Sequence, residues 1–374
     1  MCIRDRSYSM YAIVIIIFSV TAFINLSPQF GTNPTRSQKK IYSNYPNHID
    51  GEFENLQNTP MLTEDISYLD FFKEDTSIIN SDNTPDRKIE PIRIDIDSFK
   101  DIDDKKFKMA WLGHSSFMMN IQGKIILLDP MLGKHAAPLP LPSLERYSSE
   151  LPFYIDSLPG IDIVIISHDH YDHLDHFTIK RIRDKVRQFI VPVGVDNHLR
   201  GWGVKEERVA KLNWNENISI DGIEITCLPS RHFSGRGPFN RKSTLWGSWA
   251  IKDSNINIYF SGDTGYGDHF KDIGRDFGPF DLVLLDTGQY NSAWKYSHMF
   301  PFESVRAAKD LNSQFFMPIH WAGFTLSKHP WDEPIEKSIE YAEKEGMRYI
   351  APMIGEVISN EELDKSFIEW WNEY

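Results

Sequence analysis

Short apolar runs recur along the chain from about residue 107 onward, separated by polar or glycine-containing turns. Such runs, bounded by turn residues, are typical of β-strands. The first three follow one another closely, which predicts a β-meander. The expected strands are Lys108–Leu112, Phe117–Ile121, Ile125–Leu128, Ile161–Ile166, Phe189–Val193, Ile223–Leu228, Ser248–Ile251, Ile256–Phe260, Leu282–Leu285 and Phe315–Pro318.

Three other segments have the spacing of amphipathic helices. In Phe177–Phe189 the apolar residues fall on one side and the charged residues on the other. Further helices are expected at Phe302–Leu311 and Pro334–Glu345. Because strands and helices interleave and hairpins are included, we expect an α/β protein with two mixed β-sheets flanked by helices.

The N-terminal part has a different pattern. Residues 1–9 (MCIRDRSYS) are interpreted as an extraneous leader that precedes Met10. Residues 10–29 contain the nearly continuous apolar run Tyr11–Leu26, which is short for a full membrane span and fits a signal peptide or an anchor. We expect an uncleaved anchor that associates the chain with a membrane, on the cell-envelope or periplasmic side.

Residues 30–104 are polar and rich in Asn, Asp, Ser and Pro, which predicts a linker that wraps around the main domain. The aromatic residues expected to dock on that domain are Phe53, Tyr68, Phe71 and Phe72. Residues 105–374 are expected to form the main domain.

Composition narrows the choice of function. The formal net charge of −13 argues against nonspecific binding to nucleic acid, which requires a basic surface. Only two cysteines occur, which excludes a disulfide scaffold and a cysteine-rich zinc module. A metal would therefore be bound by histidine and carboxylate side chains.

The segment Ser167–Asp175 (SHDHYDHLD) has that composition. It contains three histidines and three aspartates and directly follows an expected buried strand. Ligands at a strand end are held by a rigid element, which suits a preorganised metal site. Imidazole and carboxylate donors at this spacing can bind two adjacent cations.

Three further candidates stand at the ends of other expected strands. His232 follows Ile223–Leu228, Asp263 follows Ile256–Phe260, and His320 follows the strand that begins at Phe315. A single histidine or aspartate at a strand end is a weak signal, but three in this order support one another.

The pattern H-x-H-x-D-H after a strand resembles the metallo-β-lactamase superfamily. This resemblance implies that residues 105–374 form an αββα sandwich with hydrolase activity. It also implies that Asp263 bridges two cations, with zinc expected and iron or manganese as alternatives. The implied ligands are His168, His170 and His232 for one cation, and Asp172, His173 and His320 for the other.

Five further motifs and an upstream element narrow the resemblance to one branch. Together they resemble the N-acylphosphatidylethanolamine-hydrolysing phospholipase D family and its RomA-like and lactonase-like bacterial relatives. These are WLGHSS at Trp111–Ser116, LDPM at Leu128–Met131, ISHDHYDHLD at Ile166–Asp175, SGDTG at Ser261–Gly265, PIHW at Pro318–Trp321 and GEFEN at Gly51–Asn55.

That branch implies cleavage of a phospholipid phosphodiester to phosphatidic acid and an N-acylethanolamine. The alternatives are hydrolysis of another substrate, such as a phosphorylated sugar lactone, and a binding protein that has lost its activity. A phospholipid or another small anionic ester and a membrane surface are the expected partners, without nucleic acid. The oligomeric state is left open, with a homodimer as one option.

The resemblance also assigns roles around the metals. Asp172, Asp263 and His298 are expected to be catalytic, and His298 to bind phosphate or protonate the leaving group. Asp129 and His114 are expected to support the ligands by hydrogen bonds. The residues expected to contact substrate are Gln289, Tyr290 and His298, with Trp294 and Tyr296 as further candidates.

Overall fold

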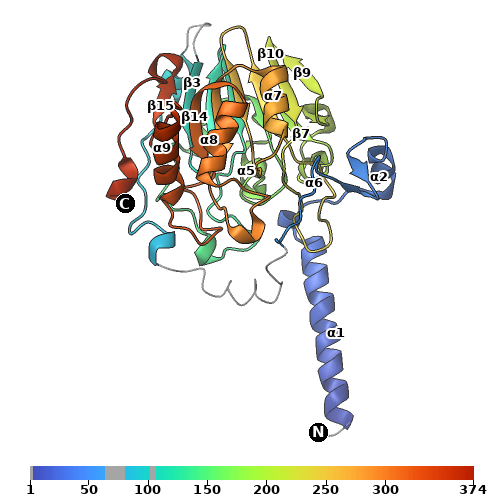
Figure 1. Ribbon diagram of the computed structural model, residues 1–374. Helices are drawn as coiled ribbons and strands as arrows, with labels where there is room; N and C mark the ends of the chain where they lie inside the picture. The colour runs from blue at the N-terminus through green and yellow to red at the C-terminus, as the bar shows by residue number, and fades with distance from the viewer. Residues whose placement is uncertain (1–2, 64–80, 102–106) are drawn as a thin grey trace.

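The computed structural model describes residues 3–63, 81–101 and 107–374. Two mixed β-sheets face each other, and helices cover their outer faces (Figure 1). The α/β class and the αββα arrangement predicted from the sequence are therefore confirmed.

The first sheet has seven strands in the order β15-β3-β4-β5-β6-β7-β8. Strands β3, β4 and β5 form the predicted antiparallel meander, and β5 to β8 run parallel to one another. The bounds are β3 Phe107–Trp111, β4 Phe117–Ile121, β5 Lys124–Leu128, β6 Ile161–Ile165, β7 Val186–Pro192, β8 Val209–Leu212 and β15 Val357–Ser359.

The second sheet has six strands in the order β14-β13-β12-β11-β10-β9. Strands β12, β13 and β14 are parallel, whereas β9 to β12 pair antiparallel. The bounds are β9 Asn217–Ile220, β10 Ile223–Leu228, β11 Ser248–Lys252, β12 Asn257–Phe260, β13 Phe280–Asp286 and β14 Ser313–Ile319.

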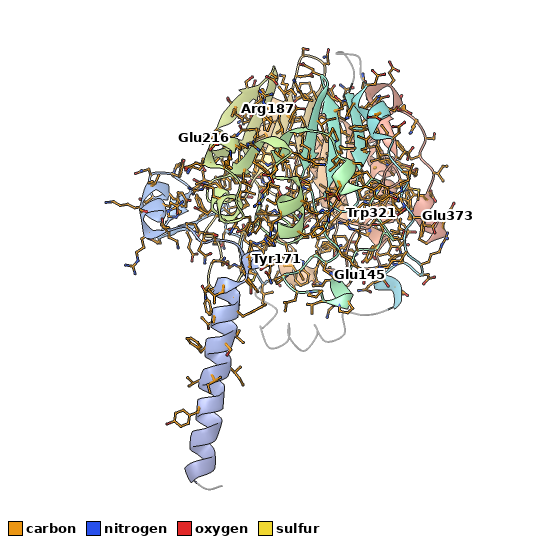
Figure 2. The ribbon with its side chains drawn as sticks, turned by 180° about the vertical axis from the view of Figure 1, so that it is seen from behind. Glu145, Tyr171, Arg187, Glu216, Trp321 and Glu373 are labelled. Atoms are coloured by element: carbon orange, nitrogen blue, oxygen red, sulfur yellow. The ribbon has the colours of Figure 1, made fainter. Side chains whose placement is uncertain are left out.

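Alternate side chains of each strand enter different cores. In β6, Ile163 belongs to the core between the two sheets, while Val164 packs with α5 and α6 on the outer face. In β13, Leu282 faces the central core and Val283 packs with α7, α8 and α9. This period of two explains why both sheets are buried on both faces. Figure 2 shows the side chains that fill the sandwich, with Trp321, 1% exposed, among them.

The helices along the chain are short, apart from the first and the last. From residue 96 onward they are α4 Ile96–Lys100, α5 His176–Ile182, α6 Asp196–Gly201, α7 His269–Phe277, α8 Pro301–Asp310 and α9 Glu333–Glu345. The N-terminal part contains α1 Ile3–Leu26, α2 Arg36–Tyr42 and the small hairpin β1 His48–Ile49 and β2 Glu52–Phe53.

The predicted helix Phe177–Phe189 is wrong in its second half. Helix α5 ends at Ile182, and β7 begins at Val186. The segment from Val186 pairs in parallel with β6, with Val186 opposite Ile161 and Phe189 opposite Val164. Its apolar residues are therefore buried in the sheet, and this packing determines the structure although their spacing would also fit a helix.

The expected membrane anchor is also wrong. No helix among residues 3–63, 81–101 and 107–374 combines the length and the hydropathy that crossing a membrane requires. The apolar run Tyr11–Leu26 lies within α1, and sixteen helical residues rise only about 24 Å against a hydrocarbon core of ~30 Å. The expected cell-envelope location rested on this anchor and is therefore not supported.

Parts of the segment 30–104 pack against the sandwich. Phe53 is fully buried in the central core and contacts the rings of Tyr42 and His48. The other aromatic residues expected to dock lie outside the described residues: Tyr68, Phe71 and Phe72. The predicted division into a leader, an N-terminal segment, a linker and a main domain stays a prediction.

Candidate metal centre

The candidate site lies where strands of both sheets end. In the first sheet, the loop that begins at Ser167 follows β6, and Asp129 follows β5, the parallel neighbour of β6. In the second sheet, Asp286 ends β13 and His320 follows the parallel strand β14. The carboxyl ends of parallel strands share one edge of a sheet, so the topology brings these side chains together.

All seven ligands predicted from the sequence are brought together. With His114 they form two groups, and within each group the potential ligand atoms lie within 4.8 Å of one another. The first group is His168, His170, His232 and Asp263, and the second is His114, Asp172, His173 and His320.

Three imidazoles converge in the first group. His170 Nδ1 lies 2.9 Å from His168 Nε2 and 3.2 Å from His232 Nε2. Nitrogen ligands around a tetrahedral zinc ion, each about 2.0–2.1 Å from the metal, are about 3.3 Å apart. The three nitrogens are therefore spaced nearly as ligands of one cation.

The second group is centred on the Asp172 carboxylate. Asp172 Oδ2 lies 3.1 Å from His320 Nε2, 3.3 Å from His173 Nε2 and 2.8 Å from His114 Nε2. This group contains the second predicted ligand set together with His114.

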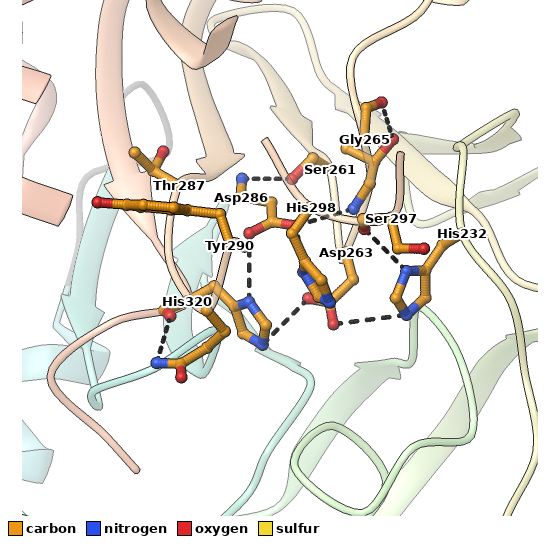
Figure 3. A network of polar contacts seen from close by, with 12 residues as sticks. His232, Ser261, Asp263, Gly265, Asp286, Thr287, Tyr290, Ser297, His298 and His320 are labelled. Atoms are coloured by element: carbon orange, nitrogen blue, oxygen red, sulfur yellow. Dashed lines mark hydrogen bonds and ion pairs between the residues drawn. The ribbon is translucent and has the colours of Figure 1, made fainter. Parts of the chain in front are cut away.

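Asp263 connects the two groups, because each of its carboxylate oxygens faces a different one. Oδ2 lies 3.6 Å from His168 Nε2 and 3.7 Å from His232 Nε2. Oδ1 lies 3.0 Å from His173 Nε2 and 3.4 Å from His320 Nε2 (the Asp263–His232 and Asp263–His320 contacts are drawn in Figure 3). This is the placement expected of a carboxylate that bridges two cations.

Most of the ligand imidazoles are oriented by a second contact. An imidazole whose Nδ1–H donates a hydrogen bond keeps the Nε2 lone pair free for a metal. His170 differs, because its Nδ1 faces the group. The Nδ1 partners are Ser167 Oγ for His168, Asp129 Oδ2 for His173, the Ser297 carbonyl for His232 and Asp286 Oδ1 for His320.

The two predicted supporting residues lie beside the ligands. Asp129 is fully buried, accepts from His173 Nδ1 at 2.7 Å and also accepts from the Ser167 amide. His114 is fully buried and contacts Asp172 as described. Burial and the neighbouring His320 lower the pKa of His114 to about 4, so His114 is neutral at pH 7.

The electrostatics favour positive charge at the bridge. Burial acts to raise the pKa of Asp263, but His173 and His320 outweigh it and hold that pKa well below its usual range. Burial lowers the pKa of His320, whereas Asp263 and Asp286 raise it to a net value of about 10. Burial and neighbouring His173 lower the pKa of His168 well below its usual range. The ionised Asp263 and the low-pKa imidazole of His168 are in the charge state of metal ligands. Burial acts to lower the pKa of His173, but Asp263 and Asp172 raise it well above its usual range, so His173, like His320, would release a proton when a cation binds.

Two buried atoms support this interpretation. His173 Nε2 and Asp263 Oδ1 lack a hydrogen-bond partner in the part of the chain that the structure describes. They lie 3.0 Å apart, and His173 uses its other nitrogen to donate to Asp129. When His173 is neutral, its Nε2 lone pair faces the Asp263 carboxylate, and a cation between or beside the two atoms stabilises this arrangement. The donor set therefore fits a pair of metal ions.

The structure adds Asp286, which the sequence analysis missed. Its buried carboxylate contacts His298 Nδ1 at 3.0 Å and His320 Nδ1 at 3.2 Å (Figure 3). It also accepts a hydrogen bond from the Thr264 amide. Asp286 therefore orients one predicted ligand and the predicted phosphate-binding histidine together. Asp286 ends β13, so its place at a strand end could be read from the sequence, whereas its contacts with His298 and His320 could not.

A cavity of about 450 Å³ opens over the two groups. Its polar lining includes His170, Asp172, Asp263, His298 and His320. Its other side is apolar and is lined by Met61, Leu62, Phe233, Trp294 and Leu326. Of these five residues, only Trp294 was expected in the site from the sequence.

Gln289 and Tyr290, which were predicted to contact substrate, differ in whether they line the cavity. Gln289 lines the cavity, but its amide also donates to the carbonyls of His320 and Phe324 and accepts from Leu326 N. Tyr290 donates to Glu333.

Tyr290 and Tyr296 are absent from the described residues that line this cavity. The Tyr296 ring lies under the Arg231 guanidinium, 4.4 Å from the ring centre. Of the four predicted aromatic and amide contacts, only Gln289 and Trp294 reach the cavity.

Comparison with known proteins identifies similar chains. A family model described as "Beta-lactamase superfamily domain" matches residues 124–321. An uncharacterized protein of Mycobacterium tuberculosis is 39% identical over 324 residues, which cover 86% of this chain and 86% of that protein. The N-acyl-phosphatidylethanolamine-hydrolyzing phospholipase D 1 of Caenorhabditis elegans is 34% identical over 229 residues, or 58% of this chain and 64% of that protein.

Solved structures share the fold. The isothiocyanate hydrolase from Delia radicum gut bacteria superposes with a TM-score of 0.53 at 21% sequence identity. The match covers 67% of this chain and 98% of that chain. At this level of identity the likeness concerns the fold and not the substrate.

Proposed function

This chain belongs to the metallo-β-lactamase superfamily of metal-dependent hydrolases, and we propose that it hydrolyses the phosphodiester of an N-acylated phosphatidylethanolamine or a closely related phospholipid. The proposed products are phosphatidic acid and an N-acylethanolamine. Water adds across the bond between phosphorus and the ethanolamine oxygen, which leaves with a proton. The observation that carries this proposal is the cavity, which is lined both by the predicted metal ligands and by apolar side chains.

We assign two zinc ions to the site, because histidine nitrogen and carboxylate oxygen are suitable zinc ligands. His168, His170 and His232 would hold one ion, Asp172, His173 and His320 the other, and Asp263 both. When bound, such a pair supplies Lewis acidity toward a phosphoryl oxygen and lowers the pKa of water in the site.

His298 is the proposed substrate-facing group. Its Nδ1 is held by Asp286, and its ring stacks on His320 with centroids 5.1 Å apart and an interplanar angle of 16°. The side chain lines the cavity, so Nε2 is available to the substrate. From there it would donate a hydrogen bond to a phosphate oxygen or a proton to the leaving ethanolamine oxygen.

The apolar wall supports a lipid over a sugar. Phe233, Trp294 and Leu326 offer hydrocarbon contact area beside the polar groups. A sugar carries hydroxyl groups on every side, and burying them against apolar side chains would leave them without hydrogen bonds. An acyl chain would gain free energy on the same surface. The phosphorylated sugar lactone is therefore the weaker candidate.

A panel of substrates tests this proposal with the zinc-loaded chain. We expect turnover of N-palmitoyl phosphatidylethanolamine in detergent micelles, with phosphatidic acid and N-palmitoylethanolamine detected by mass spectrometry. We also expect slow turnover of bis(p-nitrophenyl) phosphate, because it contains the same bond without the lipid. A chelator-stripped sample is the control and should turn over neither. Hydrolysis of a phosphorylated sugar lactone without hydrolysis of either phosphodiester would overturn the proposal.

A further inference from the structure

A segment outside the matched family domain reaches the metal centre. Residues 54–63, which we call the strap, follow β2 and run across the site from the N-terminal part of the chain. Met61 and Leu62 of the strap line the cavity, and Thr63 N donates to the Ala293 carbonyl. The strap is therefore in contact with the same loops that carry predicted site residues.

Within the strap, Asn55 contacts the backbone of His232 on both sides. Asn55 Nδ2 donates to the His232 carbonyl at 2.7 Å, and the His232 amide donates to Asn55 Oδ1 at 3.1 Å. The side-chain amide thus pairs with one residue as a neighbouring β-strand would. Two bonds on opposite sides of the Cα restrict rotation of the whole residue.

His232 needs such a support, because it lies in an irregular segment. Between the end of β10 and the start of β11, residues 229–247 contain neither a helix nor a strand. The backbone at His232 therefore has no strand ladder to hold it. Its imidazole Nδ1 donates to the Ser297 carbonyl at 3.0 Å, a contact that orients the ring but not the backbone.

Asn55 itself is held from both directions. The buried Trp246 indole donates to Asn55 Oδ1 at 3.2 Å. Just before Asn55, the Phe53 amide donates to the Lys242 carbonyl, and Lys242 Nζ lies 2.6 Å from the Glu54 carboxylate. With Phe53 buried in the central core, the position of Asn55 follows from the fold.

We propose that Asn55 is a positioning residue for His232, so that the N-terminal strap sets the geometry of one metal-binding position. This inference rests on the proposed role of His232 as a metal ligand. Removal of the Asn55 amide would free the His232 backbone and weaken that position while leaving all seven ligands in place. Loss of a hydrogen-bond partner of a metal ligand typically weakens metal binding about 10- to 100-fold.

The test compares Asn55→Ala with a matched strap variant, Gln57→Ala. Gln57 also tethers the strap, through Asp268, but does not contact His232. Zinc affinity is measured by competition with a chromophoric chelator, and cobalt substitution reports the ligand geometry through its visible absorption. We expect about tenfold weaker binding of one of two zinc ions and an altered cobalt spectrum for Asn55→Ala, with wild-type values for Gln57→Ala.

A second substitution covers the case in which Asn55→Ala fails to fold. Asn55→Asp keeps an acceptor for the His232 and Trp246 N–H groups but cannot donate to the His232 carbonyl, so we expect weakened zinc binding here too. Wild-type zinc affinity and cobalt spectrum in the folded Asn55 variants would overturn the inference. A wild-type chain that binds no zinc would instead refute the metal site, so the two failures are distinguishable.

Discussion

Replacing Asp263 by alanine is expected to reduce hydrolysis by at least about a thousandfold, since metal centres stabilise transition-state charge by several kcal/mol. Its two carboxylate oxygens face different ligand groups, so the change removes a ligand from each. We expect fewer than two equivalents of bound metal as well. Activity on a phosphodiester and metal content by mass spectrometry are the measurements, with circular dichroism to establish that the variant is folded.

The control for this prediction is another aspartate that has no contact with the site. Asp276 is half-exposed on α7, where it pairs with Arg275. Asp276→Ala should retain wild-type activity and metal content. Wild-type turnover in folded Asp263→Ala would contradict the bridging role.

Replacing His298 by alanine has the second-largest expected effect. Turnover should fall about 10²- to 10⁴-fold, the range for loss of a general acid or base, while two equivalents of metal are retained. The reason is that His298 lines the cavity and contacts Asp286 but is not one of the seven predicted ligands. It lies in a further group of possible ligand atoms with Asp263, Asp286 and His320, so the retained metal content tests whether it holds a cation.

The leaving group distinguishes the two possible roles of His298. If the imidazole protonates the leaving oxygen, His298→Ala should reduce the turnover of bis(p-nitrophenyl) phosphate less than that of the phospholipid, because p-nitrophenolate leaves without a proton. If it binds phosphate, the turnover of both substrates should fall by a similar factor. His176→Ala, at the start of α5 and outside the cavity lining, is the matched histidine control. Unchanged turnover of both substrates in His298→Ala would refute either role.

The central motif could be predicted because its information is local. His168, His170, Asp172 and His173 are close in sequence, follow a strongly apolar strand, and converge in the structure. His232, Asp263 and His320 were predicted from their places at strand ends. Placing a residue at the carboxyl end of a strand limits where it can lie once the strands are parallel.

Other parts of the site depend on contacts that no local pattern encodes. Asn55 and His232 are 177 residues apart. The GEFEN element, which ends at Asn55, indicated a family resemblance but not the contact with His232. Met61 and Leu62 line the cavity from the strap as well. Asp286 was missed for a different reason, because a strand-end aspartate has a partner only when His298 and His320 are placed beside it.

The errors in the fold have a similar origin. Apolar residues from Phe177 to Phe189 fit a helix, and only the pairing of β7 with β6 decides against it after Ile182. Strands β8 and β9 were not predicted, because each is short and interrupted by polar residues such as Lys211 and Ser219. Short edge elements give weak periodic signals.

The metal content of the wild-type chain is the most direct test of the two-cation centre. The purified chain is stripped with a chelator, titrated with zinc and analysed by isothermal calorimetry and by elemental mass spectrometry. We predict two equivalents of zinc per chain, together with recovery of phosphodiester hydrolysis as the second equivalent binds. Saturation well below two equivalents, or full hydrolysis in the stripped chain, would contradict the two-cation site.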